Sequence, residues 1–156
     1  DTPRVTAAIF TLLLGAILFG YFLTIPQTPQ KVTEFLTNLG IGRYGVLALI
    51  MLMYLVLGCL MDALAMIILT VPIIFPVIKE LGFDPIWFGV IIVMTVELGL
   101  IHPPVGMNIF VIKSVVEDVK ISTVFYGVLP FIVTDILRLV LLIAFPIIAL
   151  WLPSRM

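Results

Sequence analysis

Charged residues are scarce in this chain of 156 residues. They make up 11% of it, whereas a typical soluble domain has about 25%, and 63% of the residues are hydrophobic. The mean hydropathy is +1.34. This balance excludes an ordinary soluble domain, and it predicts an all-α integral membrane protein.

Basic residues, cysteine and histidine are also few. Eight Lys and Arg residues against nine Asp and Glu residues give a net charge of −1, which leaves no basic footprint for nucleic acid or anionic lipid. One cysteine, Cys59, excludes an internal disulfide, and with one histidine it disfavours a metal cluster. The sequence has no glycine-rich phosphate-binding loop, so we expect no ATP site.

Long apolar runs fill most of the chain. Residues 5–25 carry no charge and match the roughly 20 residues that cross a bilayer, so they predict a transmembrane helix. Residues 26–43 predict an interfacial connection, with a short amphipathic helix over residues 31–39 whose apolar stripe lies along the membrane surface. Because the chain begins at Asp1, we expect a fragment or a processed product.

The next apolar stretch, residues 44–79, is too long for one simple crossing. We interpret residues 44–58 as a transmembrane helix and residues 59–81 as a re-entrant hairpin. The bend is placed at residues 70–72, because Pro72 pushes the residue before it out of the helical region. Two helices with a proline kink are the alternative.

Two further spans are predicted, a broken helix over residues 86–112 and a helix over residues 121–152. The charged loop between them slightly favours a cytoplasmic position by the positive-inside rule. In the last span, Asp135 and Arg138 are three residues apart, so we expect them to pair on one helix face.

The break in residues 86–112 is the main functional signal. Pro103 and Pro104 lack an N–H and clash with the preceding turn, so the first half-helix must end near residue 100. Its unpaired carbonyls carry partial negative charge, which suits a cation. Pro104 can begin the second half-helix, whose free amides near Gly106 suit an anion. The alternative is a kink that serves packing alone.

Polar residues near the break and the hairpin have predicted roles. Glu97 is costly at the bilayer centre, so we expect it to face the interior, where it binds a cation or a proton or holds the unwound backbone. Asp62 is expected to cap the hairpin helix, and Thr70 to bind a cation at the bend. His102 is expected to cap loose backbone, with a proton shuttle as the alternative.

Four runs of the sequence resemble the large membrane subunit of tripartite ATP-independent periplasmic (TRAP) transporters. The resemblance covers residues 58–112. It rests on Gly58-Cys-Leu-Met-Asp62, Leu69-Thr-Val-Pro-Ile, Gly82-Phe-Asp-Pro-Ile-Trp-Phe-Gly89 and Glu97-Leu-Gly-Leu-Ile-His-Pro-Pro-Val-Gly-Met-Asn-Ile-Phe110.

The resemblance implies a sodium-driven importer of organic acids, such as C4-dicarboxylates or sialic acid, in the bacterial inner membrane. It implies no covalent cofactor and no enzyme activity. The partners would be a small membrane subunit, a periplasmic substrate-binding protein and the rest of the large subunit. The large subunit would have two inverted repeats and move as an elevator, and this chain would be its C-terminal repeat.

The resemblance also assigns the candidate site residues. Asp62 and Glu97 would support the site. Sodium would be bound, largely by backbone carbonyls, at Thr70, Val71, Gly99, His102 and Pro103, and the substrate at Pro104, Val105, Gly106 and Asn108.

Three other functions stay open. One is a sodium- or proton-coupled carboxylate symporter that needs no binding protein, and another is a non-transporting structural membrane subunit. A membrane enzyme is poorly supported, because no second acid or metal-ligand cluster lies near His102 in the sequence.

Overall fold

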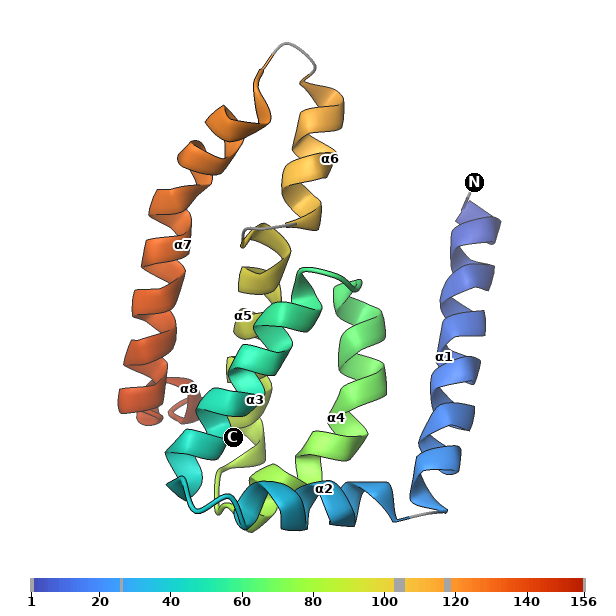
Figure 1. The fold of residues 1–156 in the computed structure, drawn as a ribbon, viewed down its shortest axis with the longest axis vertical. Coiled ribbons are helices and arrows are strands. Elements are labelled where there is room, and N and C mark those ends of the chain that lie inside the picture. The colour runs from blue at the N-terminus through green and yellow to red at the C-terminus, as the bar shows by residue number, and fades with distance from the viewer. Residues whose placement is uncertain (1, 26, 103–105, 117–118, 156) are drawn as a thin grey trace. The chain divides into compact units, whose positions relative to one another are not determined.

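The computed structural model describes residues 2–25, 27–102, 106–116 and 119–155. Within these ranges every regular element is helical, which confirms the all-α prediction (Figure 1). The helices are α1 (Thr2–Thr24), α2 (Thr28–Thr37), α3 (Gly42–Gly58), α4 (Ala63–Glu80), α5 (Pro85–Ile101), α6 (Met107–Val115), α7 (Ile121–Ala144) and α8 (Ile147–Leu150), followed by a 3-10 turn, Pro153–Arg155.

Three of these helices are long and apolar enough to cross a membrane. They are α1 over Pro3–Phe22, α4 and α7. Two shorter helices, α3 and α5, are also apolar. This composition agrees with an integral membrane protein.

The chain divides into two compact units. The first consists of Asp1–Leu47 and Leu64–Phe83, and the second of Ala48–Ala63 and Asp84–Met156. We describe each unit by itself.

In the first unit, α1 contacts α2. Helix α2 lies at the position of the predicted amphipathic helix and begins with Pro29 in its first turn. Thr33 and Leu36 are buried, whereas Phe35 is exposed. Phe35 therefore lies outside the buried stripe of α2.

Helix α4 is continuous through residues 70–72, so the bend predicted there is wrong. Pro72 and Pro76 both lie inside the helix. Each proline removes one backbone hydrogen bond, and the rest of the helix is kept, since free polar groups are costly in an apolar environment.

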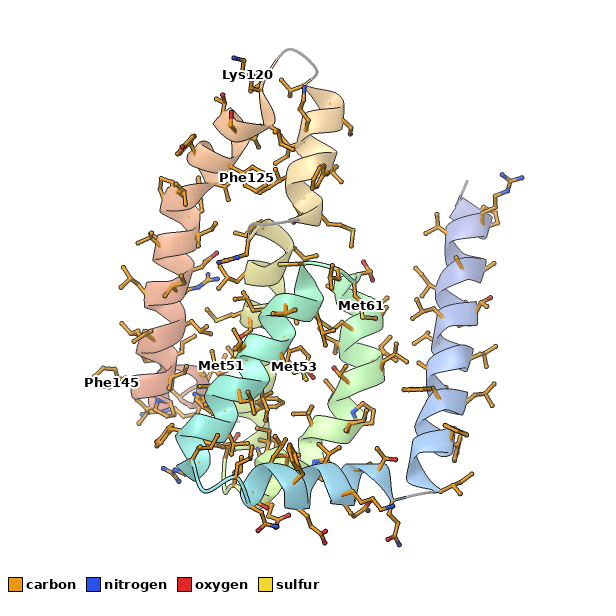
Figure 2. The ribbon with its side chains drawn as sticks, viewed as in Figure 1. Met51, Met53, Met61, Lys120, Phe125 and Phe145 are labelled. Atoms are coloured by element: carbon orange, nitrogen blue, oxygen red, sulfur yellow. The ribbon has the colours of Figure 1, made fainter. Side chains whose placement is uncertain are left out.

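The turn between α3 and α4 lies earlier, at residues 59–62. The amides of Leu60 and Met61 both donate to the Leu57 carbonyl, at 2.9 and 2.8 Å (Met61 is labelled in Figure 2). At the other end, the rings of Tyr44 and Phe83 are 5.6 Å apart within the first unit, so the start of α3 lies beside the end of α4.

The second unit is built around α5, which contacts α6, α7 and α8. Its start follows from Asp84-Pro85: the Asp84 side chain accepts from the amides of Ile86 and Trp87 at 2.8 and 3.1 Å, and Pro85 occupies the first turn. The last predicted span is shorter than expected, because α7 ends at Ala144 and Pro146 precedes the short helix α8.

Candidate functional site

The predicted interruption is present between α5 and α6. Helix α5 ends at Ile101, and His102 after it is extended, with φ −78° and ψ 136°. Helix α6 begins at Met107, after Gly106 in the left-handed region at φ 51°. The predicted site residues Pro103, Pro104 and Val105 lie outside the described residues.

Two prolines explain which carbonyls the interruption frees. In a continuous helix the carbonyls of Gly99 and Leu100 would accept from the residues four positions later. Those positions are Pro103 and Pro104, which have no N–H to donate. The end of α5 therefore presents carbonyl oxygens that lack their helical partners, and a helix C-terminus carries partial negative charge.

A glycine pair brings the end of α3 against the end of α5. A Cβ atom added to Gly99 would lie 2.9 Å from the Cα of Gly58 and 3.1 Å from the Leu55 carbonyl oxygen. A Cβ atom on Gly58 would lie 3.0 Å from the Cα of Gly99. Only glycine allows this approach, so two negative helix ends meet at one point.

Cys59 joins the two helix ends directly. Its buried thiol donates to the carbonyls of Gly99 and His102, with Sγ–O distances of 3.5 and 3.7 Å. A thiol is a weak donor, so one carbonyl that Pro103 leaves unpaired has only a weak partner. Sequence reasoning did not assign a role to Gly58 or Cys59, although both stand in the first family-like run.

The two predicted ligands on α4 do not lie in a loop. Thr70 and Val71 belong to the first unit, inside a continuous helix. The Thr70 hydroxyl donates to the Met66 carbonyl at 2.7 Å. The bend on which their assignment rested is absent, and the turn lies at residues 59–62 instead.

The start of α6 carries the described part of the predicted anion site. Gly106 is buried, and a Cβ atom there would lie 3.1 Å from Ile109 Cδ1 and 3.2 Å from the His102 carbonyl oxygen. Asn108 is exposed in the first turn of the helix. Amides at such a helix start suit a carboxylate.

Glu97 and Asp62 are the two acidic residues that were predicted to support the site. The predicted roles of Glu97 at the site stay predictions, and its side chain is exposed in this structure. The physical reason is helical periodicity: α5 buries Thr95, Val96 and Leu98, and Glu97 falls on the opposite side. Asp62 is also exposed and directly precedes α4, at the position that a capping residue takes.

An open apolar pocket in the second unit is lined in part by His102, the residue at the interruption. Its volume is about 330 Å³, and the polar lining residues are Thr95 and His102. The Thr95 hydroxyl donates to the Ile91 carbonyl at 2.8 Å, so it is already paired. The aliphatic lining, which includes Met51 of α3 (Figure 2), is unsuited to a carboxylate.

Side chains do not form a metal centre in the described ranges, where no three His, Cys, Asp or Glu residues gather. In the second unit, Arg138 pairs with Asp135 at 3.0 Å, which confirms the predicted ion pair.

These features define a class: multi-pass helical membrane proteins that also contain an interruption between two shorter helices, here α5 and α6. In secondary transporters such interruptions hold ions and solutes. The chain matches the family model described as "Tripartite ATP-independent periplasmic transporter, DctM component" over residues 1–148. It belongs to this family, as its sequence predicted.

Curated relatives agree with this assignment. The chain is 33% identical to the C4-dicarboxylate TRAP transporter large permease protein DctM of Pseudomonas aeruginosa, over 99% of the chain and 36% of the relative. It is 33% identical to the sialic acid TRAP transporter large permease protein SiaM of Vibrio cholerae, with the same coverage. The isethionate TRAP transporter permease protein DctMQ of Oleidesulfovibrio alaskensis is 33% identical over 85% of the chain and 21% of the relative.

The chain spans about a third of the length of the first two relatives, 36% in each case. All three relatives are named as permeases.

Proposed function

We propose that this chain is part of a sodium-coupled importer of a small organic acid in the bacterial inner membrane. A periplasmic binding protein would deliver the acid, and a small membrane subunit and the rest of the large subunit would complete the complex. The family membership supports this proposal, as do relatives named for C4-dicarboxylate, sialic acid and isethionate.

The sodium site that we propose lies where α3 and α5 end. The observation that carries it is the Gly58–Gly99 contact, with the Cys59 thiol on the Gly99 and His102 carbonyls. Two helix ends with partial negative charge converge there. The proposed ligands are carbonyls of residues 99–103 and of the turn at residues 59–62, which takes the place of Thr70 and Val71.

This arrangement suggests how the ion and the hairpin are coupled. A cation among these carbonyls would outweigh the weak thiol bond, and it would hold the α3–α4 turn against the interruption. The hairpin would then be ordered when sodium is present. We propose that this hairpin is the re-entrant one, and that it moves with α5 as part of an elevator.

The acid is proposed to bind at the start of α6. The amides of Gly106 and Met107, with the Asn108 side chain, would receive the carboxylate, and Pro104 and Val105 complete the proposed site. Because Gly106 has a φ of 51°, alanine there would be strained as well as crowded.

The test is uptake into proteoliposomes that contain the full-length subunit and its small membrane partner. We expect sodium-dependent uptake of an organic acid in the presence of the binding protein. Gly106→Ala or Pro104→Ala should abolish uptake while the complex stays folded. Gly127→Ala is the control, because an added Cβ there meets nothing within 4 Å.

Unchanged uptake in both variants would overturn the assignment of the interruption. Uptake without the binding protein would instead favour a symporter that works alone. A folded wild-type complex that transports no organic acid under either condition would indicate a structural subunit.

A further inference from the structure

An arginine in the first turn of α3, within the first unit, lies against two aromatic rings. The guanidinium carbon of Arg43 is 4.8 Å from the centre of the Tyr44 ring and 5.3 Å from that of Phe83. Its Nη2 also donates to the Tyr44 hydroxyl at 3.0 Å. Such stacking holds a guanidinium in place, although its side chain is otherwise mobile.

The cap of α4 positions one of these rings. Gly82 is left-handed at φ 75°, its amide donates to the Lys79 carbonyl, and the Phe83 amide donates to the Ile78 carbonyl, both at 3.1 Å. This pattern is the Schellman motif, which fixes the path of the chain just after a helix. The Phe83 ring then meets the Tyr44 ring at 71°.

The remaining donors of Arg43 have no acidic partner in the part of the chain that the structure describes. A guanidinium has five N–H donors in a planar fork, and Tyr44 takes one of them. The fork geometry matches two oxygens of a phosphate or carboxylate group. Arg43 is thus held in place by two rings and has no acidic partner among the described residues.

The position of Arg43 at the end of an apolar helix indicates which kind of anion it would meet. Arg43 lies in the first turn of apolar helix α3, and Lys79 lies in the last turn of apolar helix α4, with Nζ 5.9 Å from the Phe75 ring centre. Basic and aromatic residues at the ends of apolar helices are typical of the membrane–water boundary. The abundant anion at that depth is the phosphate of a phospholipid headgroup.

We propose that Arg43, seated on Tyr44 and Phe83, binds the headgroup phosphate of an anionic phospholipid. This site does not depend on the proposed transport function. The net charge of −1 excluded a broad basic footprint, whereas one stacked guanidinium is a local site that total charge does not detect.

The test is native mass spectrometry of the full-length subunit in detergent, titrated with phosphatidylglycerol. We expect Arg43→Gln to weaken binding about 10-fold, since a charge-assisted bidentate contact is lost. Arg43→Lys keeps the charge but loses the planar fork of donors, so its affinity for the lipid should lie between those of the wild type and Arg43→Gln. Lys120→Gln is the charge-matched control, because Lys120 is exposed in the loop before α7 (Figure 2).

Two chemical arms identify the ligand. Diacylglycerol, which lacks phosphate, should not compete, and millimolar inorganic phosphate should compete poorly. Equal lipid binding by the wild type and Arg43→Gln would overturn the site. Efficient competition by inorganic phosphate would overturn its assignment to lipid, and an equal loss in Lys120→Gln would show that only total charge matters. If Arg43→Gln does not fold, Arg43→Lys decides the outcome in the same way.

Discussion

Near each end of α5, a carbonyl oxygen that lacks its helical donor accepts a hydrogen bond from a side chain, and the two donors differ in strength. At the start, the buried Trp87 indole donates to the Leu142 carbonyl of α7 at 2.9 Å. At the end, the Cys59 thiol donates to the Gly99 carbonyl at 3.5 Å. Leu142 and Gly99 each stand four residues before a proline, Pro146 or Pro103, so each carbonyl lacks its helical donor.

This difference in donor strength suggests that the two ends of α5 have different roles. An indole N–H is a full donor, and a buried bond of this kind fixes α5 against α7. A thiol is a weak donor, so the Gly99 carbonyl is held in place while little energy is needed to redirect it. We infer that the start of α5 is a fixed anchor and that its end is available for a ligand.

The largest effect should come from closing the space at the ligand end. Gly99→Ala places a Cβ 2.9 Å from the Gly58 Cα, so the ends of α3 and α5 must separate. We expect sodium-dependent uptake to fall by about 100-fold, as displacements near 1 Å do in other sites.

The matched control is Gly89→Ala on the same helix, where an added Cβ meets nothing within 4 Å. This variant should transport normally and gain slightly in helix propensity. If Gly99→Ala transports as well as Gly89→Ala, the contact of the two helix ends has no part in transport.

At the anchor end, Trp87→Phe keeps the ring but removes the indole N–H. The Leu142 carbonyl would then be buried without a partner, and we expect the free energy of unfolding to fall by about 1–3 kcal/mol. Thermal unfolding of the purified protein measures this. Trp151→Phe, at an exposed ring, should change stability by less than about 0.5 kcal/mol.

A second substitution tests the cause of that loss. Pro146→Ala restores an N–H four residues after Leu142, so in the Trp87→Phe background it should recover part of the stability. If Pro146→Ala gives the same change with and without Trp87, the indole and the proline are not coupled through this carbonyl.

A smaller effect is expected from the cap of α5. Asp84→Ala removes the acceptor for the amides of Ile86 and Trp87, which should cost about 1 kcal/mol and speed hydrogen exchange at these two amides. Glu80→Ala, an exposed acid at the end of α4, is the control. Equal exchange rates in the two variants would mean that the cap does not protect the anchor.

Sequence patterns predicted the helix interruption that adjacent prolines cause, but not the features that depend on contacts between distant residues. The interruption near Pro103 was predicted correctly, because two adjacent missing N–H groups act within one turn. The bend at residues 70–72 was predicted wrongly, because single prolines four residues apart leave most hydrogen bonds of α4 intact. The actual turn at residues 59–62 directly follows Gly58, and the contact of Gly58 with Gly99 is one that no local pattern reveals.

The Trp87–Leu142 bond was also missed, since it joins residues 55 positions apart. The sequence did contain a signal for the acceptor of this bond. Pro146 leaves the Leu142 carbonyl without its helical donor, so a donor from elsewhere was needed. The sequence does not say that the donor is Trp87, because that follows from the packing of α5 on α7.

Substitutions of Cys59 test whether the weak hydrogen bond at the end of α5 affects sodium binding. Cys59→Ser replaces the thiol with a stronger donor to the same carbonyls, which would then compete with sodium. A gain of about 1 kcal/mol in that bond should raise the half-saturating sodium concentration about 5-fold, with little change in the maximal rate. Cys59→Ala, which removes the donor, should shift it the opposite way or leave it unchanged. If serine and alanine shift the sodium dependence equally, Cys59 acts through packing, and the weak bond at the end of α5 has no bearing on the ion.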